Sequence, residues 1–152
     1  MALSLHKDTF GDLIDPFNGM DDLEKGILRT PLDPDTTYSD DPLRMMRAVR
    51  FAAQLEFKIE QKSMVSLKNN AERLSIISKE RISDELNKII LCDKPSRGFD
   101  LLFSTHLLHQ FFPEMVALYG IETKNGKSHK DNFYHTLEVL DNICETTDDL
   151  WL

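Results

Sequence analysis

The sequence predicts a mainly α-helical fold, in which a bundle of helices follows a short β-containing segment. From about residue 42 onward, apolar residues recur at spacings of three and four, the period of a helix face that packs on a core. Near the N-terminus, two short apolar runs flank a polar turn, as in a β-hairpin. The 152 residues are 41% apolar and 29% charged, which is typical of a globular chain with a buried core.

The first predicted elements are short. The runs "ALSL" and "GDLID" are expected to form strands, with "HKDTFG" as the turn between them. The stretch "NGMDDLEKG" is expected to be a short helix, because Lys25 suits its last turn and Gly26 is placed to end it. The stretch "RTPLDPDTTYS" is expected to be a proline-broken connector, so Asp33 and Asp35 within it are interpreted as turn residues.

The first long helix is predicted within "SDDPLRMMRAVRF", residues 39–51, which carries three arginines at a spacing of three. A residue before proline is pushed out of the α region, so Asp41 is expected to be the N-cap and Pro42 the first helical residue. Arg44 then takes the third helical position, where a cation opposes the helix dipole. The carboxylate of Asp41, three residues earlier, is expected to offset that charge.

Further helices are predicted at about 60–72, after the N-cap Ser78, from Pro95 onward with a break at Pro113, and in "KDNFYHTLEVLDNIC". The stretch "YGIETKNGKSH" before the last helix is expected to be a polar loop with an Asn-Gly turn. The residues expected to face inward are Met64, Val65, Leu67 and Ala71, then Ile82, Leu86, Ile89 and Ile90, then Phe99, Leu102 and Phe103, and finally Leu137, Leu140, Ile143 and Cys144.

Charge is distributed unevenly along the chain. Residues 44–97 carry 12 basic and 7 acidic side chains, whereas 1–43 have a net charge of −7 and 98–152 a net charge of −6. The basic middle has two interpretations: a surface that contacts phosphates of a polyanion, or a solvated helical face, which charge alone favours.

Composition excludes some classes of protein. No apolar run approaches the ~18 residues of a membrane span, and no signal peptide is recognisable. Cys92 and Cys144 have no metal-ligand spacing, which predicts two buried thiols in a cytoplasmic protein.

The pair Asp41 and Arg44 has a chemistry that suits nucleobases. A carboxylate only accepts hydrogen bonds and a guanidinium only donates them. Adenine presents an amino donor beside a ring acceptor, N6 and N1, and cytosine presents the same pair, N4 and N3. Guanine and uracil present a carbonyl and an N–H there, so the polarity is wrong on both sides. Such a pair is predicted to select A and C against G and U, because mismatched buried polar groups are costly.

Three stretches in consistent order resemble the class II tRNA nucleotidyltransferase and poly(A) polymerase family, which includes CCA-adding enzymes. They are "LIDPFNGMDDLEKGILRTP", "SDDPLRMMRAVRFAAQLEFKIE" and "SKERISDELNKII", and the resemblance covers residues 1 to about 115. It implies that Asp41 and Arg44 belong to an "EDxxR" element that contacts the incoming base, with Asp40 where the family usually has Glu. Arg47 and Arg50 would lie near the nucleotide or brace the neck.

The resemblance also implies a division into domains. Residues 1–28 would be the C-terminal remnant of the nucleotidyltransferase head, 29–93 the neck, and 94–152 the start of a helical body or HD-like domain. Arg81 and Glu85 would be structural residues of the neck. The basic residues of the later neck and early body are candidate RNA contacts, namely Lys79, Arg81, Lys88, Lys94 and Arg97.

"HKDNFYHTLEVLDN" resembles the start of an HD domain, which many bacterial members append. His135 would be the first metal ligand of that domain, but the His-Asp doublet that follows it in such domains does not occur within these 152 residues. A lone histidine is no metal site, so we predict no complete one here.

The sequence is therefore interpreted as an internal part of an enzyme that extends RNA 3′ ends, with tRNA or another RNA and nucleoside triphosphates as partners. The whole enzyme would use Mg²⁺ with ATP or CTP, and its catalytic carboxylates would lie on a head strand outside this sequence. This part alone is expected to be inactive. The alternatives are a noncatalytic helical RNA-binding module and a fragment of an HD-type phosphohydrolase. The motifs do not separate CCA-adding, A-adding, CC-adding and poly(A) activities.

Overall fold

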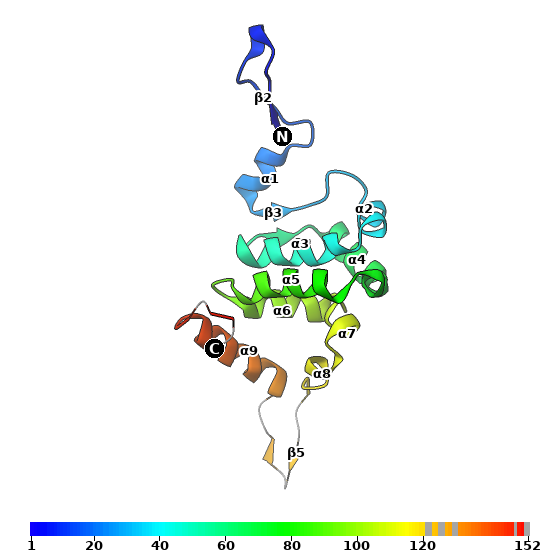
Figure 1. The fold of residues 1–152 in the computed structure, drawn as a ribbon, viewed down its shortest axis with the longest axis vertical. Coiled ribbons are helices and arrows are strands. Elements are labelled where there is room, and N and C mark those ends of the chain that lie inside the picture. The colour runs from blue at the N-terminus through cyan, green and yellow to red at the C-terminus, as the bar shows by residue number, and fades with distance from the viewer. Residues whose placement is uncertain (121–122, 125–126, 129–130, 148, 151–152) are drawn as a thin grey trace.

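The computed structural model describes residues 1–120, 123–124, 127–128, 131–147 and 149–150. An N-terminal arm, residues 1–26, projects from one end of a layered helical body, and a pair of short strands, 123–124 and 127–128, lies at the other end (Figure 1). The predicted mainly α fold with a small β-containing segment is confirmed. No helix in the described ranges is long and apolar enough to cross a membrane.

The N-terminal arm has the elements that its sequence predicts. Strand β1 (Ala2–Leu3) pairs antiparallel with β2 (Leu13–Ile14), and a 3₁₀ turn, η1 (Lys7–Thr9), lies between them. Helix α1 (Gly19–Lys25) ends at Gly26, whose φ of 62° is the left-handed conformation that glycine adopts without strain. Most apolar side chains of the arm are exposed, so the arm contributes little to the core.

The predicted connector at 29–39 is wrong in its second half, because residues Pro34–Asp40 form helix α2. The Asp33 carboxylate accepts a hydrogen bond from the backbone N–H of Thr36 at 3.0 Å, and so caps this helix. Pro34 occupies the first helical position, where its fixed φ is favourable and its missing N–H is not needed. A residue type that interrupts helices in their interior therefore starts one here.

Helix α3 (Leu43–Gln54) begins one residue later than predicted. Asp41 has extended backbone angles, φ −137° and ψ 92°, and ends α2. Pro42 is the N-cap of α3 and has no side chain to cap it, so the prediction that Asp41 is the N-cap is wrong. The backbone carbonyl of Asp41 still accepts a hydrogen bond from the N–H of Arg44 at 3.0 Å.

The body is built around α3. Helices α5 (Lys79–Ile90) and α6 (Pro95–Ser104) pack against it, α4 (Gln61–Asn70) packs on α2, and α9 (Asn132–Cys144) packs on α6. The remaining helical segments are η2 (Ala71–Ile76), α7 (Leu108–Phe111) and α8 (Pro113–Val116). One cluster of buried apolar residues runs through all these layers, and its fully buried members include Met45, Met46, Val49, Leu67, Leu74, Ile89, Leu102 and Phe133.

Short strands also occur where the sequence predicts none. Strand β3 (Ile27–Leu28) pairs parallel with β4 (Lys58–Ile59), and β5 (Thr123–Lys124) pairs antiparallel with β6 (Lys127–Ser128). Two-residue strands are too short to show an alternating pattern, so periodicity does not detect them. The predicted Asn-Gly turn falls outside the described residues.

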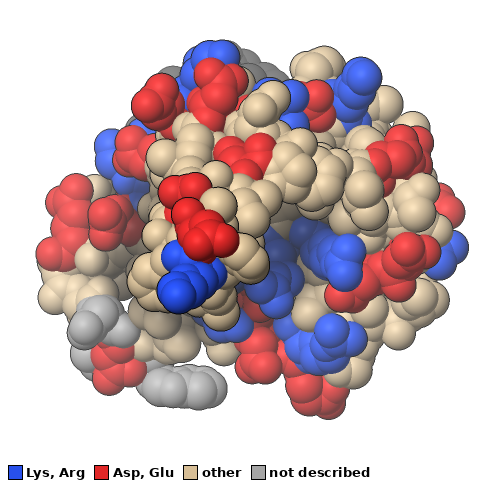
Figure 2. All heavy atoms as spheres, turned by 90° about the horizontal axis from the view of Figure 1, so that it is seen from above, with Lys and Arg blue, Asp and Glu red and all other residues tan. Residues whose placement is uncertain are grey.

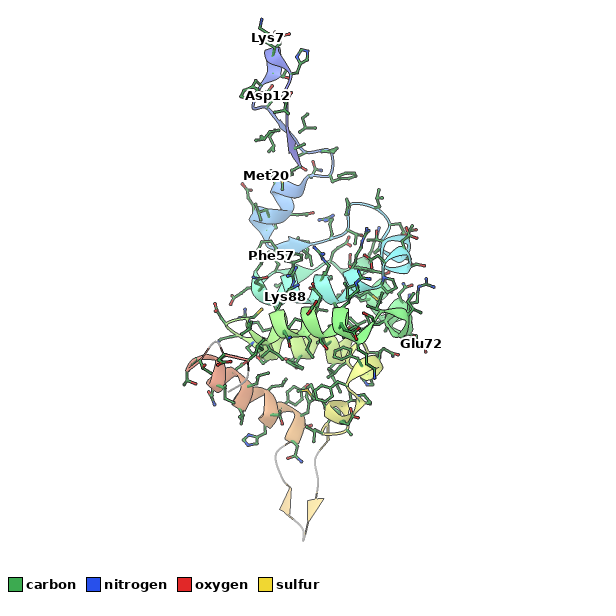
Figure 3. All side chains as sticks on the ribbon, in the orientation of Figure 1. Lys7, Asp12, Met20, Phe57, Glu72 and Lys88 are labelled. Atoms are coloured by element: carbon green, nitrogen blue, oxygen red, sulfur yellow. The ribbon has the colours of Figure 1, made fainter. Side chains whose placement is uncertain are left out.

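Most of the predicted inward residues are at least partly buried. Leu67, Ile89 and Leu102 are fully buried, whereas Val65 and Ile143 are 48% and 44% exposed, which makes those two predictions wrong. Phe57 lies below the end of α1 (Figure 3), and a Cβ at Gly26 would stand 3.6 Å from its ring.

Candidate nucleotide-binding cleft

A cleft of about 450 Å³ opens between the segment that follows β3 and the exposed face of α3. It brings together side chains that the sequence separates, namely Arg29, Tyr38, Asp41, Arg44, Arg47 and Phe51. Seen along the axis of the arm, the surface has a hollow beside the arm in which Lys and Arg side chains gather (Figure 2). The spacing of three therefore places two of the three arginines of α3, Arg44 and Arg47, in one cleft.

Asp41 and Arg44 lie side by side but do not form a direct hydrogen bond with each other. The Arg44 Nε lies 3.7 Å from the Asp41 Oδ2, which is an ion pair but too long for a hydrogen bond. The Arg44 side chain is 54% exposed and the Asp41 side chain is 39% exposed. Because Asp41 does not cap a helix, its carboxylate remains able to accept hydrogen bonds from a ligand. The pair thus presents an acceptor beside a donor in an accessible cleft.

Arg29 is a cleft residue that the sequence analysis missed. Its Nη2 lies 2.6 Å from the Oδ1 of Asp22, a residue of α1 that is 8% exposed. This short, partly buried pair anchors the guanidinium at the edge of the cleft. The available signal was an arginine directly after the short apolar pair Ile27–Leu28, ahead of a proline. With Arg44 and Arg47, it gives the cleft three guanidinium groups, which favour anionic ligands.

Arg50 lies elsewhere. Its Nε is 3.1 Å from the Oε2 of Glu85 on α5, and the two side chains are only 14% and 6% exposed. The two oppositely charged groups form an ion pair, but these two atoms are not aligned for a hydrogen bond. Arg50 does not line the cleft, so of the two roles that the resemblance offered it has the geometry of the brace between α3 and α5.

Tyr38 lines the wall of the cleft. It is 3% exposed, and burial raises the pKa of its phenol, which therefore stays protonated near neutral pH. The phenol interacts with the buried Ser63 of α4, so Tyr38 is a structural part of this wall.

The five candidate RNA contacts do not form one surface. Lys79, Arg81 and Lys94 are exposed. Lys88, which lies between α3 and α5 (Figure 3), pairs with the Oε1 of Glu85 at 3.0 Å, and Arg97 pairs with Glu56 at 2.5 Å. On α5, Arg81 and Lys88 are seven residues apart and share a face, whereas Lys79 points to roughly the opposite side.

The described residues do not fit the Mg²⁺ ions that the resemblance implies. No group of three or more His, Cys, Asp or Glu side chains in the described part of the chain is arranged to hold a metal ion. Asp33 caps α2, and Asp35 accepts hydrogen bonds from the Ser66 hydroxyl and the Asn70 amide. His135 is exposed, with its Nδ1 3.6 Å from the Oε2 of Glu138.

Comparisons with known proteins show which sequences this chain resembles. Residues 56–118 match the family described as the probable RNA and SrmB-binding site of polymerase A. The CCA-adding enzyme of Pediococcus pentosaceus is 47% identical over 95 residues, which are 62% of this chain and 24% of that enzyme. The CC-adding tRNA nucleotidyltransferase of Halalkalibacterium halodurans is 32% identical over 149 residues, which are 93% of this chain and 38% of that protein. The chain belongs to the class II tRNA nucleotidyltransferase family.

Solved structures of tRNA nucleotidyltransferases have a similar fold. The Bacillus stearothermophilus CCA-adding enzyme in complex with CTP matches with a TM-score of 0.62 and 36% identity, over 64% of this chain and 25% of that one. The Thermotoga maritima CCA-adding enzyme complexed with tRNA matches with a TM-score of 0.67 and 28% identity, over 81% of this chain and 28% of that one. The chain spans about a quarter of the length of the first curated relatives that it matches.

Proposed function

We propose that this chain is the part of an RNA 3′-end nucleotidyltransferase that selects the base of the incoming nucleotide and contributes to RNA binding. The observation that carries the proposal is the pair Asp41 and Arg44, which stand together in a cleft while remaining 3.7 Å apart. Complexes of similar proteins with CTP and with tRNA support the two classes of ligand. The division into head remnant at 1–28, neck at 29–93 and body or HD-like start at 94–152 is part of this proposal.

Base selection follows from the direction of the hydrogen bonds. The Asp41 carboxylate accepts from the amino group of cytosine or adenine, and the Arg44 guanidinium donates to the neighbouring ring nitrogen. Guanine and uracil would place a carbonyl against the carboxylate and an N–H against the guanidinium. Arg29 and Arg47 line the same cleft, and their charges favour an anionic ligand such as a nucleoside triphosphate.

The chemical step belongs to the whole enzyme. The resemblance implies that the whole enzyme uses Mg²⁺ for this step. The described residues form no group of ligands for this metal. We therefore expect the purified chain to incorporate no nucleotide into tRNA at any Mg²⁺ concentration, and measurable incorporation would contradict the assignment of Asp33 and Asp35 as structural residues.

The test of base selection is a binding titration of the chain with CTP, ATP, GTP and UTP, followed by NMR. We expect CTP and ATP to bind more tightly than GTP and UTP by about 1–3 kcal/mol per correct pairing. Asp41→Ala and Arg44→Ala should each reduce that preference, and the double variant should lose little more than either, because the pair acts as one unit. Lys62→Ala, an exposed change on α4 outside the cleft, is the matched control. Ratios unchanged in both single variants would refute the proposal.

The test of RNA binding is the salt dependence of tRNA affinity. Phosphate contacts release counterions, so the affinity should fall steeply with added salt. Variants of the exposed cations Lys79, Arg81 and Lys94 should lower the affinity more than variants of Lys88 and Arg97, which already pair with carboxylates. Salt-independent binding would contradict an RNA surface here. RNA binding without any nucleotide preference would instead favour a noncatalytic RNA-binding module.

A further inference from the structure

The cleft has a charged end and an apolar end. Asp41 and Arg44 form the charged end, whereas Leu28, Ala48 and Phe51 contribute apolar surface further along. Phe51 follows Arg44 by seven residues, so both lie on one face of α3, two turns and about 10 Å apart. This separation is comparable with the length of a nucleoside from the edge of its base to its ribose. A base read at Arg44 therefore leaves the sugar as the part that reaches Phe51.

The ring of Phe51 is held from behind by Arg50. The Arg50 Cζ lies 4.2 Å from the ring centroid, the geometry of a cation–π contact. Because the guanidinium covers one face of the ring, the surface that Phe51 offers to the cleft is its other face or its edge. Arg50 is thus one step removed from the cleft and acts on it through Phe51.

Arg50 is itself fixed by a residue of another helix. Glu85 is 5% exposed and uses its two oxygens separately, Oε2 toward Arg50 at 3.1 Å and Oε1 toward Lys88 at 3.0 Å. A buried carboxylate needs its cations, which restricts Arg50 to a narrow range of positions. A chain of contacts therefore runs from α5 through Glu85 and Arg50 to the ring in the cleft.

We propose that Phe51 forms the apolar wall against which the ribose of the bound nucleotide packs, and that Arg50, fixed by Glu85, is the positioning residue that holds this wall in place. The proposal rests on the proposed function, because it takes a nucleotide as the ligand of the cleft. In this proposal, the apolar end of the cleft contributes affinity for the nucleotide, and the charged end selects its base. The ribose is common to all four nucleotides, so the wall supports their binding equally.

The experiment measures the affinity of the chain for CTP, ATP, GTP and UTP, and for inorganic triphosphate, in wild type and Phe51→Leu. Leucine keeps an apolar side chain but removes the flat ring, so the variant is expected to fold. We expect affinity for all four nucleotides to fall about tenfold with their ratios unchanged, because leucine covers less of the ribose than the ring does. Binding of inorganic triphosphate should not change.

The positioning role is tested with Arg50→Met and Glu85→Gln. Both variants should lower the affinity for all four nucleotides by a common factor and should shift the NMR resonances of the Phe51 ring. Ile89→Val is the matched control, because it perturbs the buried face of the same helix, α5, without touching the cleft. A purely structural role for Glu85 and Arg50 would make these variants resemble Ile89→Val, with a lower melting temperature but unchanged nucleotide affinity, and would overturn the positioning role.

The outcomes separate this inference from the proposed function. If the wild type prefers CTP and ATP but Phe51→Leu binds as well as the wild type, the wall is refuted and base selection stands. If the wild type binds all four nucleotides equally and Phe51→Leu weakens them all, base selection is refuted and the wall stands. A change of ratios in Phe51→Leu would show contact with the base, and weaker triphosphate binding would show contact with the phosphates, and either overturns the ribose assignment. No nucleotide binding by the wild type overturns both proposals.

Discussion

The two ends of helix α3 carry the same residue type in opposite environments. At its start, the Arg44 side chain is 54% exposed and lies 3.7 Å from its carboxylate neighbour. Near its end, Arg50 is 14% exposed and lies 3.1 Å from Glu85. The first arginine is left available to a ligand, and the second is occupied as a brace. Burial and partners, rather than residue type, decide which arginine is able to bind.

Helix geometry explains why the arginines separate. Each residue turns the helix by about 100°, so positions six apart lie about 120° apart around the axis. Arg44 and Arg50 therefore point in different directions from α3. Arg47 lies between them around the axis and lines the same cleft as Arg44. A spacing of three distributes charges around a helix, whereas a spacing of seven, as from Arg44 to Phe51, keeps residues on one face.

The largest expected effect comes from removing the brace. Glu85→Ala leaves Arg50 buried without its carboxylate, and we expect the free energy of unfolding to fall by about 3 kcal/mol. Urea unfolding at 25 °C measures it. The double variant Glu85→Leu with Arg50→Met, which removes both charges, should recover most of the loss. A single-variant loss below about 1 kcal/mol would mean that the two ends of α3 are energetically alike.

A slightly smaller effect is expected where α5 meets α6 beside the brace. A Cβ at Gly98 would overlap the Cγ2 of the buried Ile89, so in Gly98→Ala either that side chain or the two helices must shift. We expect a loss of about 1–3 kcal/mol in unfolding free energy, as for overpacking of a core. Adding Ile89→Ala makes room for the new methyl group, so the double variant should lose less than the sum of the two single losses. Additive losses would show that the two side chains do not meet.

The third prediction contrasts two aspartates that precede helices. Asp33 caps α2 through the Thr36 N–H, and Asp33→Ala should cost about 1 kcal/mol of unfolding free energy. Asp41 does not cap α3, so Asp41→Ala should cost clearly less. Thermal unfolding of the two variants side by side compares them. Equal losses of unfolding free energy in the two variants would indicate that Asp41 also acts as an N-cap.

The smallest effect on stability is expected at the open end of α3. Arg44→Ala removes an exposed, loosely paired charge, and such pairs contribute about 0–1 kcal/mol. We expect the unfolding free energy to change by less than about 0.5 kcal/mol while the preference for CTP and ATP is lost. A large loss of stability with unchanged preference would make Arg44 a brace like Arg50 and would remove the contrast between the two ends.

Much of the fold was predictable because its signals are local. Helical periodicity, the N-cap Ser78, the opening Pro95 and the terminating Gly26 all act within a few residues of the backbone that they specify. The chemistry of the Asp41 and Arg44 pair was also readable, because both residues lie within one turn. The sequence by itself thus determined where most helices lie and which neighbouring side chains place an acceptor beside a donor.

The tertiary structure decided what depends on residues far apart along the chain. Helix α2 forms in a stretch that reads as a connector, and contacts with α4, such as that between Asp35 and Ser66, hold it there. Arg29 reaches the cleft only because β3 passes beside α3. The partner of Arg50 is Glu85, 35 residues later on another helix. Burial and long-range ion pairs are properties of packed elements, and no local pattern specifies which charge is enclosed and which stays open to a ligand.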